Sequence, residues 1–152
     1  MKKSSILILI IICLCGCGKS SKKTSITGEI KGLGTDTLYL YGMDESFDRI
    51  DTIFANGDKF SYTTSIDTIT SAYLLIDNQI EYPIFLDKGN QIKIKGNIDH
   101  LEFLDINGNK YNEEFTAFQK ELGSLNNPSE KDLEQKAEEF ITAHHSSFVS
   151  LY

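Results

Sequence analysis

The stretch RIDTIFANGDKFSYT, residues 49–63, decides the fold that we expect for this chain. Asn56 and Gly57 stand between two runs of alternating residues, and this pair tolerates the positive φ angles of a two-residue hairpin turn. Alternation with a period of two is typical of a strand that buries one face and exposes the other. The stretch therefore predicts an antiparallel β-hairpin.

The same kind of pattern recurs on both sides of this hairpin. Clear alternation is found in SITGEIK (25–31), TLYLYG (37–42) and QIKIKG (91–96). SAYLLID (71–77) and EYPIFLD (81–87) are more continuously apolar, which favours deeper strands, although Pro83 cannot donate a ladder hydrogen bond and indicates an edge or a bulge. Turn clusters separate the runs. We therefore expect a mainly β domain over residues 25–108, an antiparallel β-sandwich or barrel-like domain of about eight strands.

The period changes after Gly108, where apolar residues begin to recur at intervals of three and four. Such spacing places them on one face of a helix. The first set is Tyr111, Phe115, Phe118, Leu122 and Leu125. Ser129 is suited to cap a second helix, with Asp132 three residues on. The apolar face of that helix would hold Leu133, Ala137, Phe140, Ile141, His144 and Phe148. Residues 109–152 are thus predicted to form two amphipathic helices.

The last residues of this helical segment are apolar, and three alternatives follow from that. They include Phe148, Val149, Leu151 and Tyr152. The segment could dock on the sheet of the same chain. A protein partner could cover it instead. In the third alternative the segment is truncated, and a missing part of the protein normally covers it.

The beginning of the chain predicts where the protein is located in the cell. The start is basic, and the apolar run at residues 6–14 is too short for a membrane-spanning helix, which needs about 20 residues. It has the length of a signal-peptide core. Residues 14–17, LCGC, resemble the lipobox of bacterial lipoproteins. This resemblance implies a signal peptide over residues 1–16, lipid such as palmitate at Cys17, and a flexible tether over residues 17–24.

The cysteines of the chain all lie in this leader region, at Cys13, Cys15 and Cys17. Zinc sites need a second pair of ligands at a suitable spacing, and no such pair follows. If cleavage removes the first two cysteines, the mature chain has no free thiol and no disulfide. An uncleaved membrane anchor is the alternative to lipid attachment.

Charge limits the classes of partner. The chain has 15 basic and 22 acidic residues, a net charge of −7. Removing residues 1–16 takes away Lys2 and Lys3 and no acid, so 13 basic residues would face 22 acidic ones, a net charge of −9. Nucleic acid is not an expected partner, because phosphate binding needs a basic surface.

Tyrosines give the best candidate for a binding surface in this sequence. The residues concerned are Tyr39, Tyr41, Tyr62, Tyr73 and Tyr82. A tyrosine offers a flat apolar ring and a polar tip, so a stripe on an exposed sheet face could bind sugar rings or a peptide. The alternative is that these rings pack inside the domain or under the helices.

Three other patterns depart from known sites. GLG at residues 32–34 lacks the third glycine of a dinucleotide turn and predicts a hairpin loop. DINGN at 105–109 has its glycine at the fourth position of a calcium loop instead of the sixth, so it predicts a strand, a turn and a helix cap. His144 and His145 are adjacent, so on a helix they diverge by about 100° and cannot share a metal. We therefore assign no catalytic, cofactor-binding or metal-ligating residue.

As an ordered set, these segments resemble one domain family. It is the domain of unknown function at the N-terminus of TlpA/AhpC-TSA-type thiol-disulfide lipoproteins of anaerobic Gram-negative bacteria. In that family the helical segment leads into a thioredoxin-like (redoxin) domain with a Trp-Cys-x-x-Cys motif. The sequence ends before such a motif would begin, so the resemblance assigns no redox residue to this chain.

Two hypotheses of function follow. The favoured one is a lipid-anchored accessory or binding module of the cell envelope, facing the periplasm and without catalytic activity of its own. The membrane would be its partner through Cys17, and a protein would be its partner through the sheet surface or the apolar C-terminus. The alternative is a truncated fragment of a thiol-disulfide oxidoreductase lipoprotein whose redoxin domain is missing.

Overall fold

The structure, a computed structural model, describes residues 23–42 and 45–152. The predicted signal peptide, the predicted lipid site at Cys17 and the tether as far as residue 22 lie outside the described residues. The last two residues of the predicted tether, Lys23 and Thr24, belong to the first strand instead. Thr24 is fully buried and its hydroxyl donates to the carbonyl of Asp87, so the β domain begins earlier than predicted.

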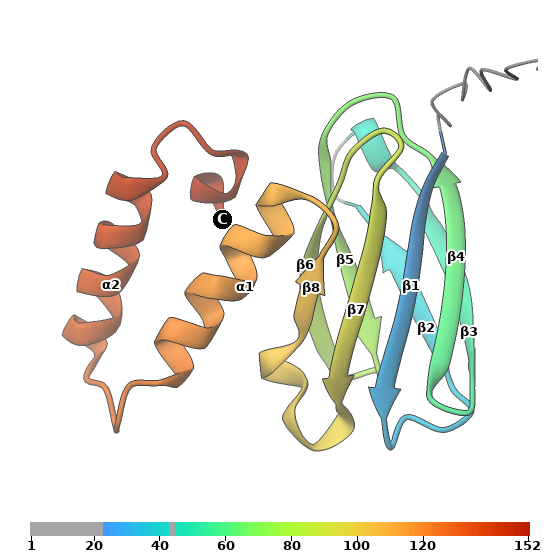
Figure 1. The fold of residues 1–152 in the computed structure, drawn as a ribbon, viewed down its shortest axis with the longest axis horizontal. Helices are drawn as coiled ribbons and strands as arrows, with labels where there is room; N and C mark the ends of the chain where they lie inside the picture. The colour runs from blue at the N-terminus through green and yellow to red at the C-terminus, as the bar shows by residue number, and fades with distance from the viewer. Residues whose placement is uncertain (1–22, 43–44) are drawn as a thin grey trace, which may run out of the picture.

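Eight strands form one sheet that curves into a nearly closed barrel (Figure 1). They are β1 (Lys23–Lys31), β2 (Thr37–Tyr41), β3 (Ile50–Asn56), β4 (Lys59–Ser65), β5 (Thr70–Ile76), β6 (Ile80–Leu86), β7 (Gln91–Asn97) and β8 (Asp105–Asn107). The strand order is β6-β5-β2-β3-β4-β1-β7-β8. All neighbours are antiparallel except β1 and β7, which run parallel. The predicted barrel-like domain of about eight strands is confirmed, except that one pair of neighbouring strands is parallel and not antiparallel.

The β3–β4 hairpin is confirmed, but its turn lies one residue later than predicted. Asn56 pairs with Lys59, so the two turn residues are Gly57 and Asp58, both with positive φ. Asp58 tolerates this conformation because it is hydrogen-bonded twice to Gly34 of the neighbouring loop, through its carboxylate and its backbone N–H. That loop joins β1 to β2, which are not neighbours in the sheet, so the hairpin loop predicted at residues 32–34 is wrong.

The barrel interior is apolar and is built from alternate residues of the strands. Its fully buried side chains include Ile26, Ile30, Leu38, Leu40, Ile53, Leu74, Ile76, Ile84, Leu86, Ile92 and Ile94. Gly28 lies among them because the ring of Phe60 occupies its side-chain position, 2.1 Å from where a Cβ would stand. Burial of these aliphatic side chains is the main stabilising contribution to the fold.

Two helices follow the barrel, as predicted: α1 (Lys110–Gly123) and α2 (Glu130–Ala143). Short 3-10 helices complete the chain: η1 (Glu45–Phe47), η2 (Ile98–Phe103) and η3 (Phe148–Leu151). The capping box of Ser129 and Asp132 is present at the start of α2. Figure 1 shows α1 against the barrel and α2 on the far side of α1. No residue of α2 is fully buried, and it meets α1 through the stacked rings of Phe118 and Phe140.

The C-terminal residues fold back onto the barrel, which answers the question left by their apolar character. The helix predicted to include Phe148 ends at Ala143, and η3 then returns to the outside of β6. The rings of Phe148 and Tyr152 pack edge-on against Phe85 at centroid distances of 6.1 Å and 5.4 Å. This segment therefore docks on the sheet of its own chain.

Helix α1 seals the gap between the two edge strands, β6 and β8, with side chains one turn apart. The amide of Asn112 accepts a hydrogen bond from Phe85 N–H at 2.9 Å and donates to Phe85 C=O at 2.8 Å. The hydroxyl of Thr116 accepts from Ile106 N–H at 3.1 Å and donates to Ile106 C=O at 3.0 Å. Each side chain thus satisfies the free backbone groups of an edge residue, as a further strand would.

Candidate binding surface on the barrel

The outside of the barrel is divided into two halves of opposite character. The outward residues of β2, β3, β5 and β6 that no helix covers are mostly aromatic or aliphatic. They are Thr37, Tyr39, Tyr41, Ile50, Thr52, Phe54, Asn56, Tyr73, Leu75, Glu81 and Pro83, and we call this surface the aromatic face. The outward residues of β1, β4, β7 and β8 are lysines, small polar residues and two acids. Because each half consists of four consecutive strands, the two surfaces lie on opposite sides of the barrel.

The structure separates the five tyrosines that the sequence offered as one surface. Tyr39, Tyr41 and Tyr73 lie together on the aromatic face, where Tyr41 and Tyr73 are direct partners across β2 and β5. Tyr82 is only 4% exposed, because its ring points into the core, edge-on to Phe115. Tyr82 therefore belongs to the core packing and not to a binding surface.

Tyr62 also points inward, at the end of the barrel where β4 finishes. Its hydroxyl donates to the carboxylate of Asp51, which is also 2.7 Å from Nε of Arg49. Arg49 in turn donates to the hydroxyl of Thr64. Desolvation, followed by the hydrogen bond to Asp51, raises the pKa of Tyr62. These polar groups satisfy one another, so Tyr62 belongs to this cluster and not to the aromatic face.

The centre of the aromatic face is the stacked pair of Tyr41 and Tyr73. Their ring centroids are 5.8 Å apart and the ring planes differ by 28°. Desolvation raises the pKa of Tyr41 to about 12, and a hydrogen bond to the carboxylate of Glu81 adds to the shift. Tyr41 is therefore a neutral donor at physiological pH, and its ring is held in place by both neighbours.

Two strongly exposed apolar side chains lie on the same face, one beside this pair and one farther along β3. Ile50 is directly opposite Tyr41 in the β2–β3 register and is 73% exposed, and Phe54 on the same strand is 74% exposed. Single exposed apolar residues are ordinary, but a continuous group of large ones marks an interaction site. Ile50 and Phe54 could not be recognised as exposed from the sequence, because Ile53 and Ala55 on the other side of the same strand are also apolar.

The residues considered as ligands or bases do not form a site. Within residues 23–42 and 45–152, no three His, Cys, Asp or Glu side chains gather closely enough to hold a metal ion. The DINGN segment forms the end of β8, a turn at Gly108 and the N-cap Asn109, as predicted. His144 stacks on Phe140 with centroids 4.3 Å apart. No helix in the described part of the chain is long and apolar enough to cross a bilayer.

Comparison with known families agrees with this architecture. A family model described as a domain of unknown function, DUF4369, matches residues 24–115, from the first buried residue of β1 to the middle of α1. No curated protein and no solved structure matches the chain. Since the match covers more than half of the sequence and nearly the whole barrel, the chain belongs to the DUF4369 family.

Proposed function

We propose that this protein is an accessory module of the bacterial cell envelope that binds another protein and catalyses no reaction itself. In this proposal a lipid on Cys17 holds it to the membrane, facing the periplasm, and the aromatic face is its binding surface. The observation that carries the proposal is the exposure of Ile50 and Phe54 on the same face as the stacked tyrosine pair. The lipobox-like residues 14–17 support the anchor.

The geometry of the tyrosine pair favours a protein surface over a sugar as the ligand. Tyr41 and Tyr73 stack on each other, so each ring covers one face of the other and less ring surface is free to stack on a sugar. Aromatic and large aliphatic side chains, by contrast, make up the buried centre of protein interfaces. Glu81 would supply a polar group at the rim.

The second candidate function is part of a thiol-disulfide oxidoreductase lipoprotein, in which this barrel positions a redoxin domain. The resemblance of the ordered segments to domains that precede such a domain supports it. A genomic observation separates the two candidates. An open reading frame that continues past codon 152 and encodes a Cys-x-x-Cys motif would favour the oxidoreductase, and a stop codon there would favour the accessory protein.

Photo-crosslinking in cells tests the binding surface. Benzoylphenylalanine in place of Phe54 should give adducts with a defined protein, because this side chain is largely exposed on the aromatic face. The matched position is Thr63, an exposed outward residue of β4 on the other half of the barrel. Ile50→Asp should abolish the Phe54 adduct. The same adducts from Thr63, or an adduct that Ile50→Asp leaves unchanged, would refute the assignment of this face.

A further inference from the structure

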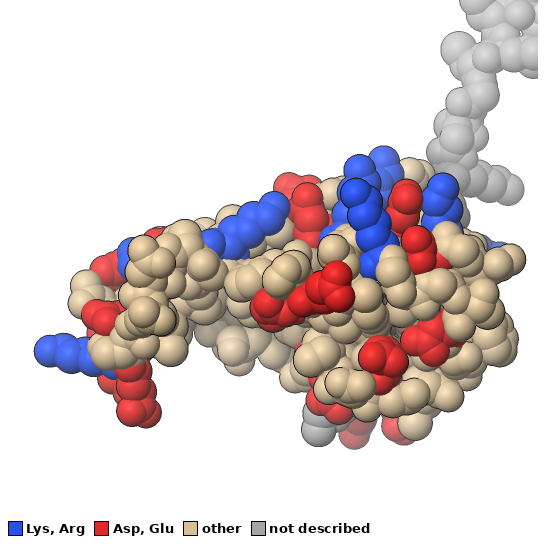
Figure 2. Space-filling view, turned by 90° about the horizontal axis from the view of Figure 1, so that it is seen from below, with Lys and Arg blue, Asp and Glu red and all other residues tan. Residues whose placement is uncertain are grey.

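The half of the barrel opposite the aromatic face carries a concentration of lysines that the proposed binding function does not use. The outward lysines of β1, β4 and β7 are Lys23, Lys31, Lys59, Lys93 and Lys95. We call this surface the basic face. Its only outward acids are Glu29 and Asp105, and its other outward residues are serine, threonine, asparagine and glutamine. Figure 2 shows several basic side chains along one edge of the molecule, with acidic side chains among them.

This charge is unusual for the chain, and three of the five lysines have no carboxylate within ion-pair distance among the described residues. The whole sequence has a net charge of −7, yet on this face five lysines meet two acids. Glu29 is 4.0 Å from Lys59. Among the described residues, no carboxylate lies within ion-pair distance of Lys31, Lys93 or Lys95. The protein therefore has a strong separation of charge between this face and the rest of its surface.

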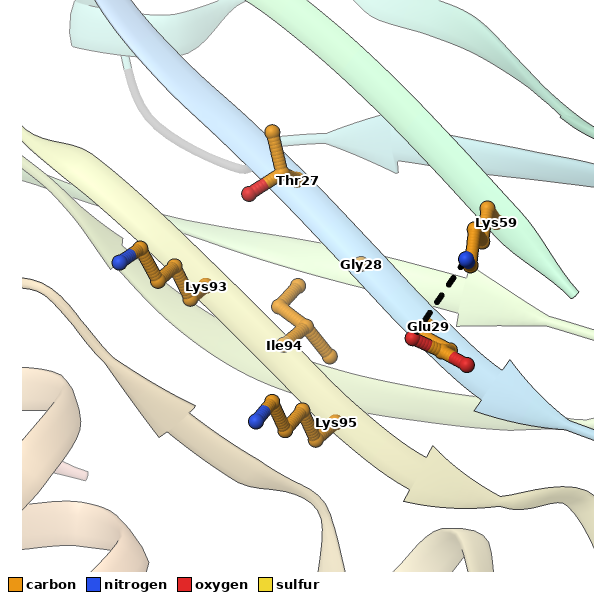
Figure 3. A pocket seen from close by; sticks show the side chains of 7 residues that line it. All are labelled: Thr27, Gly28, Glu29, Lys59, Lys93, Ile94 and Lys95. Carbon is orange, nitrogen blue, oxygen red and sulfur yellow. Dashed lines mark ion pairs between the residues drawn. The ribbon is translucent and has the colours of Figure 1, made fainter.

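The middle of the basic face is slightly hollowed. A shallow hollow of about 200 Å³ lies over β1, β4 and β7 (Figure 3). It is lined by Thr27, Gly28, Glu29, Lys59, Lys93, Ile94 and Lys95, so three lysines surround one acid. Lys93 and Lys95 are two residues apart on β7, so both extend from the same side of the strand. No large apolar side chain projects from this face. Because its outward side chains are polar and mostly basic, the surface fits a layer of phosphate groups better than the apolar surface of a protein.

The position of the proposed anchor brings such a layer within reach. β1 begins at Lys23, only six residues after Cys17. Six residues span at most about 20 Å when fully extended. A barrel held this closely to a membrane must turn some part of its surface towards the lipid headgroups. Basic side chains are attracted to anionic leaflets, and acidic side chains are repelled by them.

We infer that the basic face lies against the anionic phospholipid headgroups of the membrane that anchors the chain. The phosphates would meet Lys93 and Lys95 most directly. The aromatic face, on the other side of the barrel, would then point away from the membrane and towards its partner. This inference rests on the proposed function, because the lipid at Cys17 supplies the attachment and the basic face supplies only the orientation.

The absence of tryptophan from the sequence allows a direct test. The complete chain, isolated from membranes, is placed in vesicles of phosphatidylethanolamine and phosphatidylglycerol that contain a headgroup-linked nitroxide quencher. One variant carries Ser61→Trp on the basic face, and the other carries Thr52→Trp on the aromatic face, both at exposed strand positions. We expect at least threefold stronger quenching at residue 61 than at residue 52. The difference should disappear in vesicles without phosphatidylglycerol and at 0.5 M salt, where charges are screened.

Charge reversal provides the matched control. Lys93→Glu with Lys95→Glu should remove the difference in quenching, whereas Lys110→Glu with Lys131→Glu, on the two helices, should preserve it. Thermal melting of each variant verifies that the barrel is folded. Co-sedimentation with the vesicles reports on the anchor separately. A chain that sediments but is quenched equally at both positions would overturn this inference alone, and a chain that fails to sediment would overturn the proposed anchor and the inference with it.

Discussion

The side chain of Asn112 offers the sharpest test of how the barrel is held closed. It is 2% exposed, and it bonds to both the N–H and the C=O of Phe85 on the edge strand β6. Asn112→Ala would remove both hydrogen bonds. The Phe85 carbonyl would keep a hydrogen bond from Asn109 at 2.8 Å, but the Phe85 N–H would lose its partner in a site that the helix covers.

The size of the effect follows from these contacts. A buried donor left without a partner costs about 1–3 kcal/mol, and the lost bond to the carbonyl adds about 1 kcal/mol. We therefore expect the free energy of unfolding to fall by about 2–4 kcal/mol. For a domain of this size, that corresponds to a decrease in Tm of about 4–16 °C.

Differential scanning calorimetry of the complete chain measures this decrease. Asn126→Ala, at an exposed asparagine between the two helices, is the matched control and should change the Tm by no more than about 2 °C. Hydrogen exchange adds a local readout. The amide of Phe85 should exchange much faster in Asn112→Ala, whereas the amides of the barrel core should exchange faster only by the amount that the loss of global stability requires. A decrease in Tm no larger than that of the control would refute the view that Asn112 seals the gap between β6 and β8.

Four further predictions concern the tail, the tyrosines, the anchor and the chemistry. Deleting residues 146–152 should lower the Tm by several degrees in calorimetry, because it uncovers Phe85; an unchanged Tm would contradict the docking. The pKa values of Tyr41 and Tyr82 are raised to about 12 in the folded protein, so the unfolded chain loses these protons at lower pH. The free energy of unfolding should therefore decrease as the pH rises from about 10 to 12, and it should decrease less steeply in Tyr41→Phe. Cys17→Ser should remain an unprocessed precursor without label from a palmitate analogue, and persistent label would exclude the anchor. The chain should not reduce insulin disulfides, and significant turnover would overturn the non-enzymatic proposal.

Sequence patterns were sufficient for the elements of this fold and for its class. Alternation identified most of the strands, because most have one side in solvent and the other in the core. The change to a spacing of three and four located α1 and α2. The parallel pairing of β1 with β7 could not be predicted, since alternation is the same in either strand direction. The place of the β3–β4 turn depended on Asp58 bonding to a loop that is distant in sequence, which no local pattern contains.

The candidate surface was only partly predictable, because a period of two separates the sides of a strand without saying which side is outside. In β6 both sides are apolar: Tyr82 and Ile84 point inward, whereas Phe85 points outward under η3. The same ambiguity grouped Tyr62 and Tyr82 with Tyr41. The basic face was overlooked because its lysines come from three separate strands, and only the barrel brings them together.

Because α1 seals the gap between β6 and β8, the order of synthesis matters for this protein. Until α1 has been synthesised as far as residue 116, the backbone N–H groups of Phe85 on β6 and Ile106 on β8 lack the hydrogen bonds that Asn112 and Thr116 accept. Unpaired edge strands readily pair with other chains. A nascent chain that ends before α1 would thus be an eight-stranded sheet with two unpaired edges, and these edges could pair with the edges of other copies. Helix α1 therefore protects the barrel from edge-to-edge aggregation, and this protection begins only when α1 has packed against β6 and β8.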